Sequence, residues 1–408
     1  MDEPALLLQQ LPITKQQLRI AVVTETYPPE VNGVAMTIGR TVAAMQQRDH
    51  QIQLVRPKQS AADNPVAQEN FEEVLQRGVP IPNYSGLKMG LPAKSLLTRL
   101  WTLQRPDIVH IATEGPLGWS ALAAANKLRI PVITDFHTNF HIYSKHYGLG
   151  WLRKPIIAYL RKFHNKSLRT LVPTQGILGE LAAQGYHNLE VVSRGVDINL
   201  FDPAKRSVEL RRQWGVAENA PVVIYVGRLA AEKNLPLLVE AYAALRARQP
   251  DAKLVLVGDG PERAALQASC ADYIFAGMRI GEELAMHYAS ADMFFFPSMS
   301  ETFGNVTMEA MASGNAVLAY NYAAAAEHLR HDENGLVAEF DRPQQFIKLA
   351  ASLANQPNRI AQLGRNARKT ALSADWEKVH NKFEQVLIRL THEHGYADVE
   401  AELSLKLD

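Results

Sequence analysis

Two glutamates near residue 300 are the strongest candidates for chemistry in this sequence. Glu301 and Glu309 stand eight positions apart, which is just over two turns of an α-helix. Between them, the stretch Phe303-Gly304-Asn305-Val306 follows an apolar run, MFFFP, and is predicted to open the next helix. A helix N-terminus offers backbone N–H groups and the positive end of the helix dipole, and a glycine lets a ligand approach the chain closely. The segment therefore predicts a ligand site; a helix cap with a solvated glutamate is the structural alternative.

Two cations follow another predicted strand. In VGRLAAEKN, Gly227 ends the strand, and Arg228 and Lys233 stand before the next helix. A guanidinium can bind a diphosphate as a fork, and an ammonium can bind it as a point charge. An ordinary basic loop would have the same composition, so both interpretations stay open.

Two turns with glycine follow further predicted strands. Gly33 lies in ETYPPEVNGVAMTIG before a predicted helix, where backbone N–H groups could meet a phosphate; a plain turn is the alternative. The turn VGDGP, which contains Gly258, has Arg263 where the dinucleotide-binding fingerprint requires a third glycine. Since no such fingerprint follows the first predicted strand either, the sequence argues against an NAD-dependent enzyme.

Several histidines lie in TDFHTNFHIYSKHY, residues 134–147. His137 and His141 have the spacing of metal ligands on a helix, but the segment is not clearly helical. Thr138 stands where the zinc-binding H-E-x-x-H motif has a glutamate, and no Asp-x-Asp pair occurs in the chain. These residues therefore favour polar substrate contacts over a metal site.

Residues 136–179 contain no acidic side chain, and basic residues alternate there with apolar and aromatic ones. A basic amphipathic helix with an aromatic residue is typical of a membrane-surface element. A domain helix with an apolar core face and solvated cations is an equally good interpretation. The candidates for membrane or acceptor contact are Lys145, Trp151, Arg153, Lys154, Arg161 and Lys162.

Two series of predicted strands and helices position these segments. The first begins at 19–24 (RIAVVT). The second begins at 221–226 (PVVIYV) and includes strands at 253–257 and 293–296, and a turn-rich break at 195–206 separates the two series. Such alternation indicates α/β domains with doubly wound parallel sheets, which bind ligands at the carboxyl ends of their strands. We predict an N-terminal extension at 1–18, domains at 19–200 and 201–374, and an amphipathic helix and tail at 375–408. The helix is expected to span 375–390, and residues 391–408 to be loosely held.

Composition narrows the class of protein further. The 408 residues include 43 Lys and Arg against 42 Asp and Glu, a net charge of +1, which argues against a nucleic-acid partner. The balance conceals an asymmetry, because residues 1–200 carry 21 − 15 = +6 and residues 201–408 carry 22 − 27 = −5. One cysteine, Cys270, excludes an internal disulfide and a Cys-based zinc cluster. The lack of a signal-peptide pattern and of a long apolar run indicates a cytoplasmic protein.

Taken together, the motifs resemble those of the retaining GT-B glycosyltransferases of family 4. The resemblance extends from about residue 19 to 390. Its markers are ETYPPEVNGVAMTI, DFHTNF, SRGVDINLF, VGRLAAEKN, LVLVGDGPE and FFFPSMSETFGNVTMEAMASG. It implies two Rossmann-like domains facing across a cleft, with the C-terminal helix crossing back to the first domain.

The resemblance also implies roles for the candidate residues. Arg228 and Lys233 would bind the diphosphate of a nucleotide sugar, and Gly33 would bring a backbone N–H group to it. Glu309 would hold the ribose, Glu301 would hold the donor sugar, and His137 would lie near the reacting sugar. The backbone of Phe303, Gly304, Asn305 and Val306 would also contact the donor, and Gly258 belongs to the same donor-binding set.

The implied reaction is a retaining, metal-independent hexosyl transfer without a cofactor. The donor would be GDP-mannose or a UDP-sugar, and the acceptor a hydroxyl group, with a lipid at the inner face of a membrane favoured. A UDP-sugar-dependent enzyme acting on a soluble saccharide is the alternative. A sugar-binding protein without catalysis and a pyridoxal-dependent phosphorylase of similar architecture are further alternatives.

Overall fold

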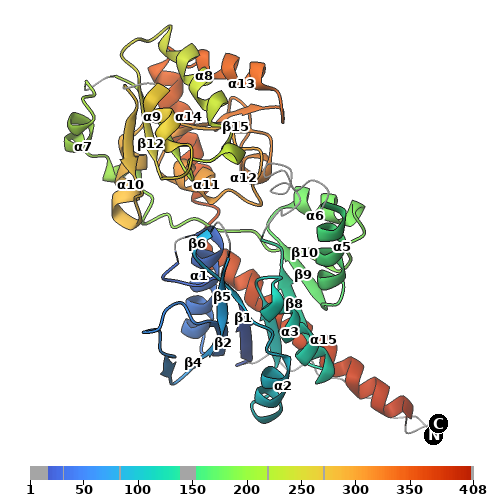
Figure 1. The fold of residues 1–408 in the computed structure, drawn as a ribbon. Helices are drawn as coiled ribbons and strands as arrows, with labels where there is room; N and C mark the ends of the chain where they lie inside the picture. Colours follow the sequence, from blue (N-terminus) through green and yellow to red (C-terminus); the bar gives the residue numbers. More distant parts are fainter. Residues whose placement is uncertain are drawn as a thin grey trace, which may run out of the picture. The chain divides into compact units, whose positions relative to one another are not determined.

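The computed structural model describes residues 17–30, 32–81, 84–137, 153–217, 220–269 and 272–405 (Figure 1). The chain divides into two compact units. The first unit comprises Met1–Ile133 and Glu384–Asp408, and the second comprises Thr134–Phe383. The predicted domain boundary near residue 200 thus lies inside the second unit.

The first unit is built on a mainly parallel sheet. Strand β1 pairs with β2 on one side and with β7 on the other, both in parallel. Most residues of these three strands are aliphatic, and beyond the first residues of β1 and β2 the strands are buried on both faces, as is typical of parallel sheets. The strands are β1 (Arg19–Val23), β2 (Gln51–Pro57), β3 (Ala67–Gln68), β4 (Phe71–Gln76), β5 (Gly78–Ile81), β6 (Tyr84–Gly90) and β7 (Ile108–Ile111).

Helices α1 (Gly33–Gln47), α2 (Lys94–Leu103) and α3 (Pro116–Lys127) connect these strands. Two of them, α1 and α3, have a local reason to begin where they do. Asn32 caps α1 by accepting hydrogen bonds from the amides of Val34 (3.1 Å) and Ala35 (2.8 Å). Helix α3 begins at Pro116, a residue that suits the first helical turn because it has no amide hydrogen to satisfy.

The C-terminal helix α15 (Trp376–Leu405) begins in the second unit and ends in the first. Glu384 on this helix pairs with Arg48 (3.1 Å) and with the fully buried His50 (3.1 Å), whose other ring nitrogen accepts from the Leu18 amide. The predicted return of this helix to the first domain is confirmed. The predicted end at 390 is wrong, because the helix continues to Leu405 through a proline-free sequence rich in alanine, glutamate and leucine.

Strand β8 (Val132–Asp135) lies where the two units meet along the chain. It belongs to an eight-stranded sheet with the order β10-β9-β8-β7-β1-β2-β4-β3. In the second unit, β9 (Arg169–Val172) and β10 (Leu189–Val191) pair in parallel and are accompanied by α5 (Arg153–His164) and α6 (Gln175–Ala183). Leu160 and Phe163 of α5 are buried, so one side of this helix packs inside the unit.

A second, fully parallel sheet has the order β13-β12-β11-β14-β15-β16. Apart from the partly buried Lys253 at the start of β12, its central strands are buried along their whole length and form the core with the surrounding helices. The predicted strands 253–257 and 293–296 agree with the structure to the residue. The strands are β11 (Val222–Val226), β12 (Lys253–Val257), β13 (Ile274–Gly277), β14 (Met293–Phe296), β15 (Ala316–Tyr320) and β16 (Leu336–Ala338).

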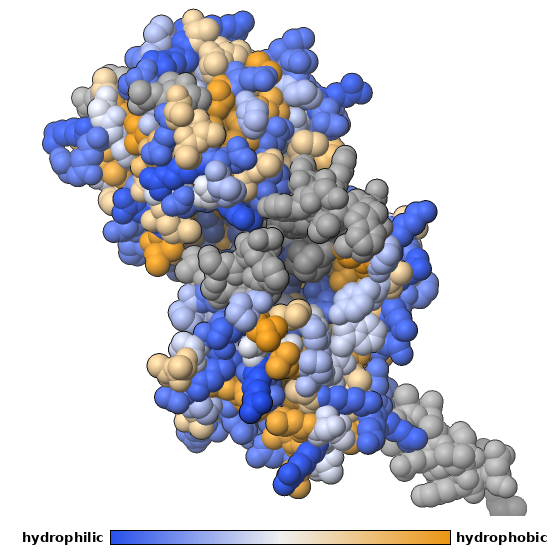
Figure 2. Space-filling model, in the orientation of Figure 1, coloured by the Kyte–Doolittle hydropathy of each residue, from blue (hydrophilic) through white to orange (hydrophobic). Residues whose placement is uncertain are grey.

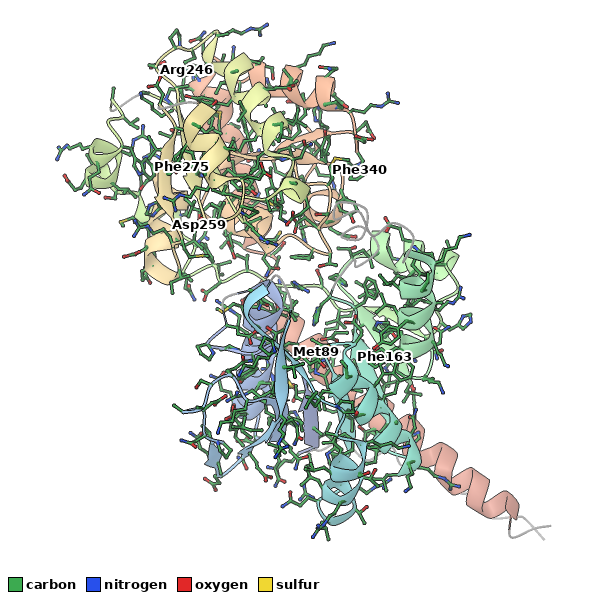
Figure 3. All side chains as sticks on the ribbon, in the orientation of Figure 1. Met89, Phe163, Arg246, Asp259, Phe275 and Phe340 are labelled. Carbon is green, nitrogen blue, oxygen red and sulfur yellow. The ribbon has the colours of Figure 1, made fainter. Side chains whose placement is uncertain are left out.

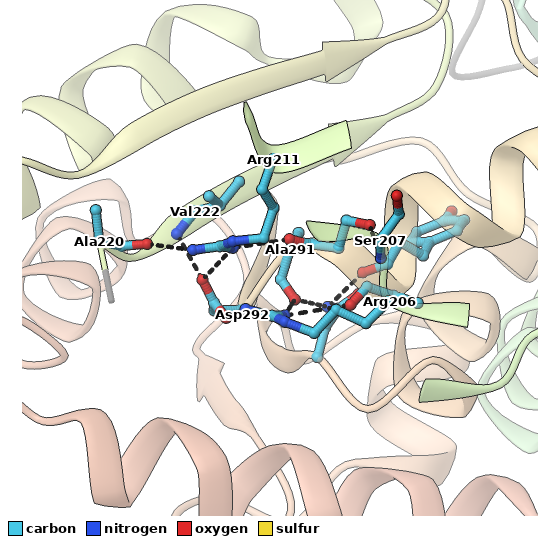
Figure 4. Close-up of polar contacts among 11 residues, drawn as sticks. Arg206, Ser207, Arg211, Ala220, Val222, Ala291 and Asp292 are labelled. Carbon is cyan, nitrogen blue, oxygen red and sulfur yellow. Dashed lines mark hydrogen bonds and ion pairs between the residues drawn. The ribbon is translucent and has the colours of Figure 1, made fainter. Parts of the chain in front are cut away.

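Helices cover both faces of this sheet (Figure 1). Helix α7 (Val208–Gln213) is attached through the buried Arg211. This side chain donates to the carbonyls of Ser290 (2.9 Å) and Ala220 (2.7 Å) and forms an ion pair with Asp292 (3.3 Å) (Figure 4). The helices of this part are α7 (Val208–Gln213), α8 (Leu235–Arg246), α9 (Arg263–Ser269), α10 (Gly281–Ser290), α11 (Asn305–Ala312), α12 (Ala323–His328), α13 (Pro343–Ala351) and α14 (Pro357–Ala371).

Candidate active site

The candidate donor-binding motifs of the second unit all follow the carboxyl ends of neighbouring strands. Arg228 follows β11, Gly258 follows β12, and Glu301 lies in the loop after β14. The three strands are adjacent in the order β12-β11-β14 and run in parallel. Their carboxyl ends therefore meet at one sheet edge, which is where ligands bind in parallel α/β sheets.

The glycines at this edge allow two loops to pack closely. A Cβ on Gly258 would lie 2.0 Å from the carbonyl oxygen of Gly227, and the φ of Gly258 is +131°. Its amide donates to the carbonyl of Gly277 (2.9 Å), and the Gly227 amide donates to that of Val257 (3.0 Å). Loop packing therefore requires glycine at 258. Asp259 of the same turn is labelled in Figure 3.

Lys233 and Glu301, two candidate catalytic residues, form an ion pair through Nζ and Oε1. Lys233 ends the short 3-10 helix η3 (Ala231–Lys233), and Glu301 also accepts a hydrogen bond from the Ser298 hydroxyl (2.7 Å). The two side chains are only 14% and 16% exposed. A cation and a carboxylate are thus presented together, and both still have limited access to solvent.

Arg228 lies at the same edge with a more open guanidinium. Its Nη1 is 3.6 Å from Oε1 of the buried Glu232, and its carbonyl accepts from the Tyr225 hydroxyl (3.0 Å). The Arg228 side chain is 39% exposed. Its backbone is therefore held while its charge faces solvent, which suits a residue that binds an anion.

Helix α11 places the second glutamate. Glu301 lies before this helix and Glu309 lies on it, where Oε2 accepts from the hydroxyl of the fully buried Tyr288 (3.0 Å). Burial raises the pKa of Tyr288 well above its ordinary value, and the Glu309 carboxylate adds to this shift. The hydroxyl therefore stays a donor and fixes the orientation of Glu309.

The N-terminus of α11 has no side-chain cap. The helix begins at Asn305 after Gly304, whose φ of +85° is in the left-handed region. Phe303 is buried against His328, with a ring-centroid distance of 6.1 Å, so its side chain belongs to the core and only its backbone faces the loop. The Val306 side chain is partly buried against the core of the unit. Asn305 has a buried Oδ1 without a hydrogen-bond partner among the described residues.

His137 is held by a group of residues that the sequence did not indicate. Arg194 donates from Nη2 to Nδ1 of His137 (2.8 Å), and Nε2 of His137 lies 3.1 Å from Oδ2 of Asp135. The Thr302 hydroxyl donates to the His137 carbonyl (2.8 Å). Arg194 also lies over the Phe303 ring, 5.9 Å from its centroid. His137 is thereby linked to the loop that carries Glu301.

Arg194 itself is a buried cation, 7% exposed. Burial lowers its pKa to about 10, and the charges of Asp135 and Glu301 oppose that shift. The sequence signal that could have revealed it is the position of Arg194 shortly after the carboxyl end of β10, in SRGVDINLF.

In the first unit, Gly33 is the first residue of α1. The next two amides, those of Val34 and Ala35, donate to Asn32 and are therefore already bound. The role of another carboxylate of this unit was not predicted: Glu25 accepts from the Leu117 amide at the start of α3 (3.1 Å). Burial raises its pKa to about 7, and Glu114 contributes to the increase.

The basic stretch is only partly described. Lys145 and Trp151 lie outside the described residues, and Arg153 begins α5. Arg161 donates to the Gln184 carbonyl (3.0 Å), whereas Lys154 and Lys162 are exposed. Helix α5 therefore combines a core face with cations at the surface.

A pocket of about 440 Å³ lies in the first unit, just beyond the carboxyl ends of β2 and β4. Its described lining includes three cations and no carboxylate. Exposed apolar residues lie close by in sequence, including Met89, and Figure 2 shows separate hydrophobic patches on the visible face of this unit. The lining residues are Lys58, Ser60, Ala61, Leu75, Gln76, Arg77, Gly78, Lys88 and Leu91.

Within the described ranges, no group of three or more His, Cys, Asp or Glu side chains could hold a metal ion. None of the helices in those ranges is both long enough and apolar enough to cross a membrane. His141, His146 and Cys270 fall outside the described ranges.

Comparison with known proteins matches both halves of the chain. Residues 31–200 match the model for "Glycosyltransferase Family 4", and residues 207–370 match that for "Glycosyl transferases group 1". A GDP-mannose-dependent alpha-mannosyltransferase of Corynebacterium glutamicum is 34% identical over 94% of this chain and 89% of its own length. An alpha-monoglucosyldiacylglycerol synthase of Streptococcus pneumoniae is 26% identical over 74% and 71%. Sucrose-phosphate synthase from Thermosynechococcus elongatus shares the fold, with a TM-score of 0.74 at 17% identity over 92% and 100%.

Proposed function

The chain belongs to glycosyltransferase family 4, and we propose that it transfers a hexose from a nucleotide sugar to a hydroxyl group of a membrane lipid. One observation carries the proposal: Arg228, Lys233 and Glu301 follow adjacent parallel strands at one sheet edge, beside the uncapped start of α11. This arrangement offers two cations and a helix dipole to a diphosphate, together with a carboxylate for sugar hydroxyls.

These residues would supply the charge stabilisation that the reaction needs. Negative charge grows on the leaving diphosphate as the sugar becomes oxocarbenium-like, and Arg228, Lys233 and the α11 amides would stabilise it without a metal or a cofactor. Glu301 is paired with Lys233, which suits a carboxylate that orients the sugar. In the proposed retaining reaction, the acceptor hydroxyl attacks the sugar on the same face that the phosphate leaves, and an oxygen of the leaving phosphate takes the proton of that hydroxyl. The enzyme then needs no protein nucleophile. Gly33 stays a predicted phosphate contact.

We favour GDP-mannose as the donor because the relative from C. glutamicum is a GDP-mannose-dependent alpha-mannosyltransferase. A UDP-sugar is the alternative. The base would lie at the loop after β13, where the apolar side chains of Met278 and Ile280 are 62% and 58% exposed and could pack against the face of a purine or a pyrimidine. Glu309, held by Tyr288, would bind the ribose hydroxyls.

A lipid acceptor is supported by the relative whose name specifies diacylglycerol and by the character of the first unit. The pocket beside β2 and β4 combines Lys58, Arg77 and Lys88 with the apolar Leu75 and Leu91. Cations beside apolar side chains suit an amphiphile with a negative headgroup. Such an acceptor would bring the protein to a membrane surface as a peripheral protein.

A donor screen tests the proposal. Purified protein is incubated with GDP-mannose, GDP-glucose, UDP-glucose and UDP-galactose, each with extracted lipids or with soluble saccharides. Released nucleotide and the lipid product are measured, and the anomeric configuration of the product is read by NMR. We expect a lipid product with retained configuration and an unchanged rate after chelation of divalent ions. Binding of sugar without nucleotide release from any donor would instead indicate a sugar-binding protein.

Two variants and a matched control connect the activity to the site. Glu309→Gln and Lys233→Ala are expected to lower donor use without unfolding the protein. Glu240→Gln replaces an exposed glutamate on α8 and should leave the rate unchanged. Wild-type rates in both site variants would contradict the assignment of the donor site.

A further inference from the structure

We propose that Arg194 is a positioning residue that holds His137 as a neutral imidazole with its proton on Nε2, and that His137 therefore does not act as a general base in the transfer step. The inference rests on the proposed function, in which His137 lies near the reacting sugar. It concerns a residue that neither the sequence motifs nor the family resemblance assigned to the site.

The direction of the hydrogen bond determines the tautomer. A guanidinium has only donors, so Nδ1 of His137, 2.8 Å from Arg194 Nη2, must accept with its lone pair. The single proton of the neutral ring is then on Nε2, which faces Oδ2 of Asp135 at 3.1 Å. The contact between Nε2 and Asp135 is electrostatic and does not meet the geometry of a hydrogen bond. With Nδ1 accepting from Arg194 and Nε2 facing Asp135, neither nitrogen offers a free lone pair to an acceptor hydroxyl.

The group is rigid, which favours a positioning role. The Arg194 guanidinium lies over the Phe303 ring, and its buried charge is balanced by Asp135 and Glu301. The Thr302 hydroxyl holds the His137 carbonyl (2.8 Å), so the backbone as well as the ring is restrained. A side chain held by hydrogen bonds at Nδ1 and at its carbonyl can be kept within the narrow geometry that a reacting sugar requires.

The charges around His137 favour the neutral ring. Protonation of Nδ1 would destroy the accepted hydrogen bond and place a second buried cation 2.8 Å from Arg194. The carboxylate of Asp135, at the end of β8, instead favours protonation of the ring. Glu301, in the loop after β14, is already paired with Lys233 from η3. On α12, His328 meets the Phe303 ring, and burial lowers its own pKa.

The test is nitrogen NMR of the histidine rings in the full chain, combined with the pH profile of transfer. In the wild type, His137 should show the Nε2–H pattern, and neither the ring nor kcat should titrate between about pH 5.5 and 8, where a free histidine changes charge. Arg194→Met removes the donor, so the ring should titrate there and kcat should fall about ten- to a hundredfold, the range of a hydrogen bond to a charged group. The donor KM should change by less than about threefold, as expected for an interaction used in the transition state.

Two further variants separate positioning from simple burial of a cation. Arg194→Lys keeps a donor and should restore part of kcat and the flat pH profile. Arg211→Met removes another buried arginine, which contacts Ser290, Ala220 and Asp292 (Figure 4), and should lower stability without changing the His137 pattern.

The proposal is overturned if wild-type His137 carries its proton on Nδ1, or if it titrates equally in the wild type and in Arg194→Lys and Arg194→Met. It is also overturned if Arg211→Met changes the ring signals as Arg194→Met does. The NMR measurement needs no substrate. A failure to release nucleotide from any donor would overturn the proposed function, and the ring signals would still decide the tautomer.

Discussion

Glu25→Gln tests the electrostatics of the first unit. Glu25 has a pKa of about 7, against an ordinary value of 4.5, because burial penalises its charge. Its Oε1 accepts from the Leu117 amide, and a glutamine oxygen can do the same. A Cβ on Gly115 would lie 2.0 Å from Oε2, so the carboxylate fills a close-fitting space. The substitution therefore removes the charge with little change of shape.

The sign of the effect follows from proton binding. Between pH 4.5 and about 7 the folded state keeps a proton on Glu25 that the unfolded chain has lost, so the stability of the wild type falls as the pH rises through this window. Above about pH 7, Glu25 is ionised in both the folded and the unfolded state, and the folded state bears the full cost of burying the charge. A shift of about 2.5 units at 1.36 kcal/mol each sets an upper limit of about 3 kcal/mol. Glu25→Gln should therefore be more stable than the wild type at pH 8, and the advantage should vanish at pH 4.5.

Urea denaturation at several pH values, followed by hydrogen exchange of the α3 amides, measures this difference. The difference between variant and wild type is the relevant quantity, because burial also raises the pKa of Glu30 in the same unit. Glu69→Gln, at an exposed position of the first unit, is the matched control and should show the pH dependence of the wild type. Parallel pH profiles of Glu25→Gln and the wild type would refute the reasoning.

Three further predictions follow from contacts at the two candidate sites. Tyr288→Phe removes the hydroxyl that orients Glu309. The donor KM, measured from initial rates, should rise at least about tenfold, because a hydrogen bond to a charged group has this value. An unchanged KM would contradict the role of Glu309. Gly258→Ala places a Cβ 2.0 Å from a carbonyl oxygen in the neighbouring loop, so calorimetry should show a clearly lower melting temperature, and an unchanged one would contradict the loop packing. Lys58→Glu combined with Arg77→Glu should weaken sedimentation with anionic vesicles but not donor hydrolysis; equal sedimentation would exclude the pocket as a lipid site.

The strands that carry the donor motifs could be predicted because they are continuous apolar runs. Strand β14, with the sequence MFFF, is buried on both faces, and its bounds agree with the prediction. The hairpin of β5 and β6 was missed, because its sequence mixes glycine, proline and polar residues, and two strands outside a buried sheet have no continuous apolar pattern. Local sequence thus predicted this fully buried strand to the residue and missed a hairpin that lies outside the two large sheets.

The candidate site was predictable only where its residues share a motif. Glu301 and Glu309 lie on one loop and one helix, so their spacing indicated their positions. Arg194 meets His137 across 57 positions of sequence, and no periodicity relates the two. Glu25 meets the start of α3 across 92 positions, and its unusual pKa depends on how much solvent the fold excludes. Such contacts follow from tertiary packing, which a single sequence does not encode in any local pattern.

The pairing of Glu384 with Arg48 and His50 has a consequence for how the protein is made. The first unit is assembled from residues at both ends of the chain, and the whole second unit is translated between them. A domain folds during synthesis once its residues have left the ribosome. His50 therefore gains its carboxylate partner only when the C-terminal helix emerges, after the whole second unit. The unit that begins first is completed last.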